Sequence, residues 1–134
     1  MMTLKEVKDW LKENITANNW KIGTYDSSQD KTISIRNLTS NLSKIAIGGL
    51  SNTSTAVKGV SIVVHWNKNP DETEQIAQKL FALFYGHSPV IGGYRVMKCD
   101  MRSDEPISVG TDDNGIYEYL IETWLTYSRD RKEL

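Results

Sequence analysis

The segment from Val57 to Trp66 has the strictest alternation of side chains in the sequence, and it constrains the fold more than any other feature. Successive side chains of an extended chain point to opposite faces. The apolar face of this segment carries Val60, Ile62, Val64 and Trp66. The sequence therefore predicts a β-strand with one face in the core.

A helix is predicted directly after this strand. Asn69 suits the N-cap position and Pro70 suits the first helical position. Asp71 and Glu72 follow in the first turn, where negative charge is favourable. Apolar residues then recur at helical spacing, and Gly86 is placed to end the helix. The expected buried stripe consists of Ile76, Ala77, Leu80, Phe81 and Phe84.

A second amphipathic helix is predicted near the start of the sequence, over residues Leu4–Ile15. Thr3 and Glu6 have the spacing of a capping box, in which each side chain bonds the backbone of the other residue. Apolar residues follow with the period of a helix, so one side of it is expected to face the core. These residues are Leu4, Val7, Trp10, Leu11 and Ile15.

Further strands are predicted where apolar and polar residues alternate, at Trp20–Tyr25, Thr32–Arg36, Tyr94–Met101 and Ile116–Ser128. In the third of these, Met97, Cys99 and Met101 are expected to share the buried face.

The remaining segments are expected to lack regular structure. Residues Asn37–Thr55 are rich in Ser, Thr, Asn and Gly, which predicts a mobile hairpin or loop. Residues Arg102–Gly115 are polar and end in an Asn-Gly turn pattern. The charged tail, residues 129–134, is expected to be frayed.

This order of helices and strands predicts an α+β fold. We expect an antiparallel or mixed sheet of four to six strands, with two helices packed on one face, in a single domain over residues 1–134.

Composition excludes several classes of protein. Hydrophobic residues make up 39% of the chain and charged residues 25%, which is ordinary for a globular protein. The net charge of −1 lacks the basic excess of a dedicated nucleic-acid binder. A single cysteine permits no internal disulfide, which suits a reducing cytoplasm. The sequence has no apolar run of about 20 residues that would span a membrane, and its start lacks the apolar stretch of a signal peptide.

The usual patterns of catalytic and ligand sites are also missing from the sequence. Neither the Walker order nor a Gly-x-Gly-x-x-Gly motif occurs, and the run Asp112–Gly115 does not fit the spacing of an EF-hand. His65, His87 and Cys99 have structural explanations at a strand end, a helix end and a core face. We therefore expect no enzymatic activity, no cofactor and no metal ion.

Taken in order, several segments resemble the small phage proteins known as minor capsid or tail-completion proteins, which are similar in plan to the tail terminators of long-tailed phages. The resemblance covers most of the chain and is weakest over Asn37–Thr55. The segments that carry it are the helix Leu4–Ile15 and the runs Val60–Glu74, Ile91–Val96 and Glu105–Tyr119.

The resemblance implies a structural protein of the virion, made in the bacterial cytoplasm. It implies a hexameric ring at the head–tail junction, on the head-proximal end of the tail tube. Such a ring ends tail polymerisation and allows head joining. Its partners would be further copies of this chain, the major tail tube protein and the head connector or stopper, and DNA would only pass through the lumen.

Interface residues are expected in the polar loop and in the last strand. Those in the loop are Pro106, Ile107, Asp112 and Asp113, and those in the strand are Glu118 and Glu122. An ordinary loop and a solvated strand face would explain the same residues equally well.

Alternative functions stay open at this point. The chain also suits another head–tail joining component, a stopper or adaptor. A small enzyme acting on a nucleotide or sugar would require a pocket with converging titratable groups. An adaptor that binds a host protein through the loop at Asn37–Thr55 would be a monomer.

Overall fold

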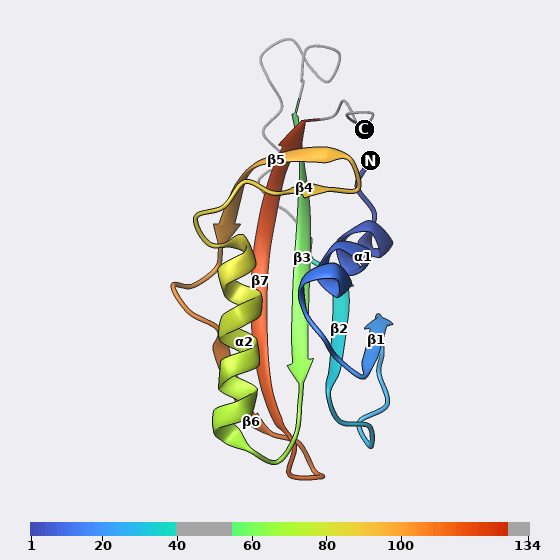
Figure 1. Cartoon of the computed structure of the whole chain (residues 1–134), viewed down its shortest axis with the longest axis vertical. Helices are drawn as coiled ribbons and strands as arrows, with labels where there is room; N and C mark the ends of the chain where they lie inside the picture. The colour runs from blue at the N-terminus through green and yellow to red at the C-terminus, as the bar shows by residue number, and fades with distance from the viewer. Residues whose placement is uncertain (40–54, 129–134) are drawn as a thin grey trace.

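The computed structural model describes residues 1–39 and 55–128, which form two helices and seven strands (Figure 1). The helices are α1 (Leu4–Asn14) and α2 (Pro70–Phe84). The strands are β1 (Asn19–Ile22), β2 (Thr32–Asn37), β3 (Thr55–His65), β4 (Val90–Ile91), β5 (Tyr94–Met101), β6 (Ile107–Thr111) and β7 (Tyr117–Ser128).

All of these strands belong to one mixed sheet, in the order β1-β2-β3-β7-β5-β4, with β6 paired to the first half of β7. The pair β1–β2 is parallel, and the other pairs are antiparallel. The predicted α+β class is confirmed. The sheet has seven strands rather than four to six, because the short strands β4 and β6 lie in segments whose glycines and polar residues hide the alternation.

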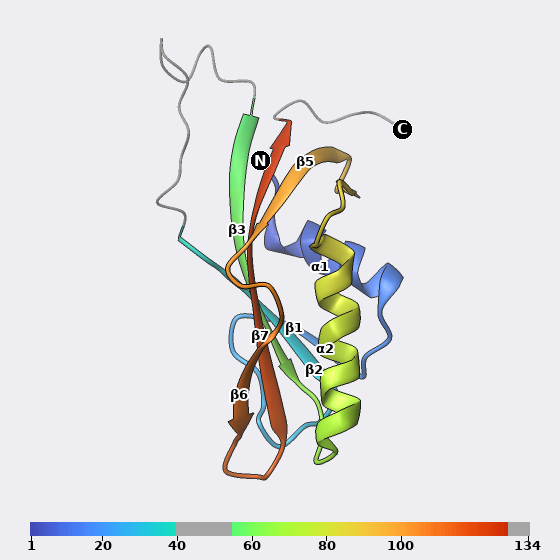
Figure 2. The same ribbon diagram turned by 90° about the vertical axis from the view of Figure 1, so that its left-hand side faces the viewer.

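Both helices pack on the same face of the sheet, as predicted, and Figure 2 shows them on one side of it. α1 begins with the predicted capping box between Thr3 and Glu6. α2 begins with the side chain of Asn69 accepting the N–H groups of Asp71 and Glu72. Gly86 follows the end of α2 with φ +75°, as expected of a residue that ends a helix.

The core lies between the helices and the inner face of the sheet, the face that they cover. Its centre consists of residues that the alternation in β2, β3 and β7 points inward, and α1 contributes Val7 and Leu11. Completely buried members of this layer include Ile33, Ile35, Val60, Ile62, Val64 and Leu125.

The predicted burial pattern of β5 is wrong at Met97, whose side chain is 41% exposed. A β-bulge causes the error: Val96 pairs with Tyr127, but Lys98 pairs with the adjacent Thr126, so one extra residue is inserted in β5. Val96 is therefore completely buried, whereas Cys99 and Met101 are partly buried against the core.

The loop predicted at residues 37–55 lies largely outside the described residues. Its ends belong to strands, since Asn37 closes β2 and Thr55 opens β3. The tail predicted to be frayed, residues 129–134, also lies outside them.

Candidate functional site

The loop between β1 and β2 crosses the outer face of the sheet, the face opposite the helices. Gly23 begins this loop with φ +89°, so β1 ends earlier than predicted. The carbonyl of Gly23 accepts hydrogen bonds from Ser34 Oγ at 2.6 Å and from Arg36 Nε at 3.3 Å. Ser34 and Arg36 alternate with the core residues of β2 and therefore point outward. The loop therefore begins its path across the outer face at β2.

The crossing reaches His65, the last residue of β3, whose side chain is completely buried. Its Nδ1 lies 3.0 Å from Oε2 of Glu118, near the start of β7, and its Nε2 lies 3.0 Å from the carbonyl oxygen of Ser27 in the loop. The hydroxyl of Tyr25 donates to the same Glu118 oxygen. The rings of Tyr25 and His65 pack with their centroids 5.0 Å apart. These contacts fix the loop over β3 and β7.

The turn between β6 and β7 joins the same cluster. Oδ1 of Asp112 accepts the N–H groups of Asn114 at 2.9 Å and Ile116 at 3.0 Å, which shapes the turn. Oδ2 of Asp112 lies 3.6 Å from Nε2 of His65. Nδ2 of Asn114 donates to the carbonyl of Ser27 at 3.1 Å. We call the resulting cluster the His65 network; its members are Tyr25, Ser27, His65, Asp112, Asn114 and Glu118.

Oxygen atoms surround both ring nitrogens of His65. These oxygens belong to the carboxylates of Glu118 and Asp112 and to the carbonyl of Ser27. Burial raises the pKa of the Tyr25 hydroxyl well above its ordinary value of 10.0, and the hydrogen bond to Glu118 raises this pKa further. Tyr25 therefore stays a hydrogen-bond donor at neutral pH.

The His65 network is suited to holding segments together, not to chemistry on a substrate. The imidazole is completely buried, and the side chains of Glu118 and Asp112 are only 14% and 15% exposed. A catalytic base needs an open approach for the group whose proton it removes. The neighbours of the imidazole close that approach.

The structure places half of the predicted interface residues in internal contacts. Asp112 and Glu118 belong to the His65 network. Glu122 is 8% exposed and forms an ion pair with Arg102, which is itself more than half exposed. The carboxylates of β7 are therefore bound within the subunit.

The other predicted interface residues lie along β6 and its ends. Pro106 is buried just before the strand, and Ile107 is partly buried opposite Leu120 of β7. Asp113 is exposed in the turn after the strand. The structure thus places Pro106 and Ile107 at the start of β6 and Asp113 beyond its end.

The sequence does not mark Tyr25, Ser27 or Asn114 as functional residues. Tyr25 and Ser27 follow a short strand within a polar stretch, and Asn114 looks like an ordinary turn residue. Their roles depend on pairing across 93, 38 and 87 positions of the chain, to Glu118, His65 and Ser27 respectively. No local pattern in the sequence marks such contacts.

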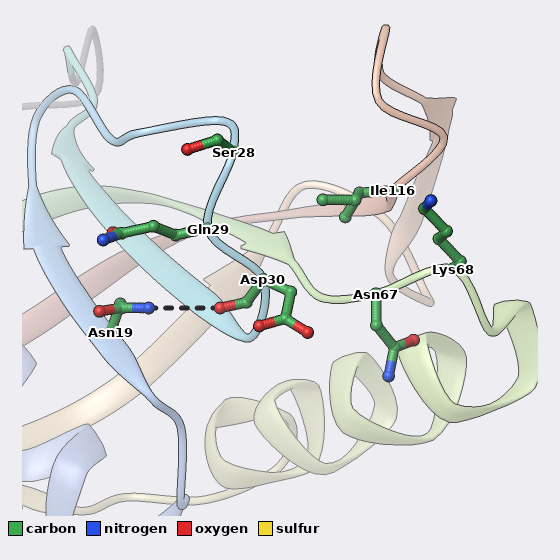
Figure 3. Close-up of a pocket in the computed structure, with 7 residues that line it drawn as sticks. All are labelled: Asn19, Ser28, Gln29, Asp30, Asn67, Lys68 and Ile116. Atoms are coloured by element: carbon green, nitrogen blue, oxygen red, sulfur yellow. Dashed lines mark hydrogen bonds between the residues drawn. The ribbon is translucent and has the colours of Figure 1, made fainter.

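A shallow pocket lies beside the His65 network (Figure 3). Asn19, Gln29 and Asp30 stand on one side, and Asn67 and Lys68 on the other. Nδ2 of Asn19 donates to the carbonyl of Asp30 at 3.3 Å, so one wall is held in place. The lining is mainly amide and hydroxyl groups, which bind by hydrogen bonds, and its ionisable members are Asp30 and Lys68.

Metal-ion clusters and membrane-spanning helices are both absent from the described ranges, residues 1–39 and 55–128. There, no set of three or more His, Cys, Asp or Glu side chains is arranged to hold a metal ion. No helix in those ranges has the length and apolar character needed to cross a membrane.

Comparison with known proteins gives one family. The model of the family described as bacteriophage tail terminator protein matches residues 10–129, from within α1 to just beyond β7. No curated protein matches the sequence. The matched region contains every strand of the sheet and the whole His65 network. This chain therefore belongs to the bacteriophage tail terminator protein family, whose members are structural proteins of the virion.

Proposed function

We propose that copies of this chain form a ring on the head-proximal end of the phage tail tube, where the ring ends tube polymerisation and presents a surface for head joining. The observation that carries this proposal is the family match over residues 10–129. Because it includes all of the strands, it applies to the folded body of the protein and not to one motif.

The form of the subunit supports a ring, for which we propose six copies. A ring requires two different surfaces on each subunit, so that one copy meets the next head to tail. The sheet has β1 at one lateral edge and β4 and β6 at the other. The His65 network holds the loops at one end of the sheet in a fixed position, as a stacking surface requires.

The proposed partners are the major tail tube protein on one side of the ring and the head connector or stopper on the other. The proposed location is the head–tail junction of the virion, after synthesis in the host cytoplasm. DNA would pass through the lumen. A net charge of −1 favours passage, because tight binding of the DNA backbone relies on an excess of Lys and Arg.

We infer a structural role without catalysis. The buried His65 and its closed surroundings support this inference, since a substrate has no approach to the imidazole. The polar pocket beside it offers hydrogen bonds but pairs no nucleophile with a base among its lining residues.

The test is electron microscopy of lysates from the parent phage or induced prophage with this gene deleted. Overlong tail tubes and unattached, DNA-filled heads are the expected result. Supplying the intact gene from a plasmid should restore tails of normal length and infectious particles.

Two other outcomes contradict the proposal in different ways. Separate tails of normal length beside filled heads would indicate a stopper or adaptor in place of a terminator. Normal infectious particles from the deletion strain would remove the proposed role in the virion altogether.

A further inference from the structure

The two lateral edges of the sheet differ from each other, and each has free backbone groups. β1 lies at one edge, and the opposite edge is divided between β4 with β5 and, at the other end of β7, β6 (Figure 1). Within residues 1–39 and 55–128, no strand pairs with the outer side of β1 or of β6. Open edges of this kind are the sites at which a further strand is added.

The outer side of β1 presents the backbone groups of Trp20 and Ile22. The N–H of Asn19 donates to Lys31 and that of Gly23 donates to Ile35, so these odd-numbered residues face β2. Backbone groups alternate along a strand, and those of Trp20 and Ile22 therefore point to the free edge. The side chain of Ile22 is also 45% exposed, which is unusual for such a large apolar residue.

The free edge of the sheet at β6 also has an exposed apolar side chain. Val109 is 57% exposed, more than any other large apolar side chain in the described ranges except that of the terminal residue Met1. Thr111 is paired with Tyr117 of β7. The N–H of Tyr117 donates to the carbonyl of Asn67, and its carbonyl accepts the N–H of Trp66, so both backbone groups of Tyr117 point toward β3 and not toward β6. The backbone groups of Thr111 consequently face the free edge.

The directions of the strands make the two edges compatible. β1 runs parallel to β2, and the following pairs, β2–β3, β3–β7 and β7–β6, are each antiparallel, so β6 runs opposite to β1. Rotation about an axis parallel to the strands keeps their directions. In a ring whose axis runs along the strands, neighbouring copies would therefore meet with β6 antiparallel to β1.

We propose that β6 of one copy pairs with β1 of the next copy, with Thr111 opposite Trp20. This inference rests on the ring proposed above and names the surfaces that close it. The register joins the outward backbone groups of Thr111 and Trp20. A β-bulge between Ser108 and Gly110 interrupts the alternation at Val109, so this exposed side chain lies near Ile22 of the next copy without being its direct register partner. Apolar neighbours across two strands stabilise an antiparallel contact.

Charge favours pairing of the β6 edge with β1 of a second copy over its pairing with β6 of that copy. β6 itself has no charged residue, but acidic residues lie at both of its ends: Asp104, Glu105, Asp112 and Asp113. Two β6 edges placed together antiparallel would bring these carboxylates face to face. The charged residue of β1 is Lys21, which is exposed, so a contact of β6 with β1 brings opposite charges together.

The test is cross-linking in phage particles. The gene deletion is complemented with a Cys99→Ser chain that carries both Ile22→Cys and Val109→Cys, and purified particles are treated with a short bismaleimide. The expected result is a series of cross-linked species larger than a dimer on a denaturing gel. Each single-cysteine variant should lose this series. A control chain with Ile22→Cys and Val90→Cys should also lack the series of cross-linked species, because Val90 is as exposed as Ile22 but lies in β4.

The other outcomes separate failure of the edge contact from failure of the ring. If the particles contain the protein but the double variant gives no species beyond those of the controls, the edge contact is wrong and the terminator role stands. Dimers from Val109→Cys alone would indicate pairing of two β6 strands and would also overturn the inference. Infectious particles that lack the protein would overturn both the inference and the proposed function.

Discussion

Nδ1 of His65 lies 3.0 Å from Oε2 of Glu118, and this contact joins the end of β3 to the start of β7 within one subunit. The two residues are also register partners in the sheet. Because the same carboxylate oxygen accepts the hydroxyl of Tyr25, one side chain of β7 holds both a neighbouring strand and the loop that crosses the outer face. Glu118 thus stabilises the subunit before any partner binds.

We expect His65→Ala to lower the free energy of unfolding by about 2–4 kcal/mol. The substitution removes a completely buried ring and leaves the carboxylates of Glu118 and Asp112 without their imidazole partner. Urea denaturation followed by circular dichroism at pH 7 measures the change. Asp9→Asn is the control, since the ion pair of Asp9 with Lys5 lies on the exposed side of α1 and should contribute nothing measurable. Equal stabilities of the two variants would contradict the role of the His65 network.

A second prediction concerns stability at alkaline pH. Burial, together with the hydrogen bond to Glu118, raises the pKa of Tyr25 in the folded chain above its ordinary value of 10.0. As the pH rises above 10.0, the unfolded chain releases the Tyr25 proton while the folded chain retains it, so stability falls. Because Tyr25 is partly exposed, solvent screens its interactions, and the slope from this one group stays below about 1.4 kcal/mol per pH unit, the limit for one proton.

Tyr25→Phe should therefore be less stable than the original chain at pH 7 and should lose this part of the alkaline slope. The measurement is the urea midpoint of both proteins from pH 8 to 11. Parallel curves for the two proteins over that interval would show that Tyr25 ionises equally in the folded and unfolded chains, and the predicted shift would then be wrong.

The fold was largely predictable because its determinants are local. The alternation through Val60, Ile62 and Val64 defines one face of β3, and the pair Asn69-Pro70 fixes where α2 begins. Each pattern acts over a few residues, so each can be recognised without knowing the partner strand. The packing of both helices on one face follows from the single apolar face of the sheet.

The candidate site was not predictable to the same degree, because it depends on register between distant segments. His65 and Glu118 are 53 positions apart, and only the pairing of β3 with β7 brings them together. The inserted residue at Met97 likewise reverses the alternation in β5 without a marker in the local sequence. Sequence patterns give the face of a strand more reliably than they give its partner.

Cys99 should react slowly in the folded chain. Burial, with a smaller contribution from Asp100, raises the pKa of its thiol to about 11. Because the thiolate is the reactive form, we expect disulfide exchange with a chromogenic reagent at pH 8 to be at least about tenfold slower in the folded chain than in the urea-unfolded chain. Stopped-flow absorbance measures both rates. Similar rates would show that the thiol is not protected by its surroundings in β5.

Gly59 of β3 is predicted to tolerate no side chain, because the main chain of Leu38 lies directly against it. The N–H of Leu38 donates to the carbonyl of Gly59 at 3.0 Å, and a Cβ on Gly59 would overlap the carbonyl oxygen of Leu38. Backbone cannot move aside as the end of a side chain can, so Gly59→Ala should cost about 1–3 kcal/mol of stability. Thermal unfolding measures the loss, and Ser61→Ala, on the same face of β3, is the matched control that should stay close to the original melting temperature. If both variants melt together, the chain at Leu38 can move away from β3 without cost, and the close contact does not help to hold β2 on β3.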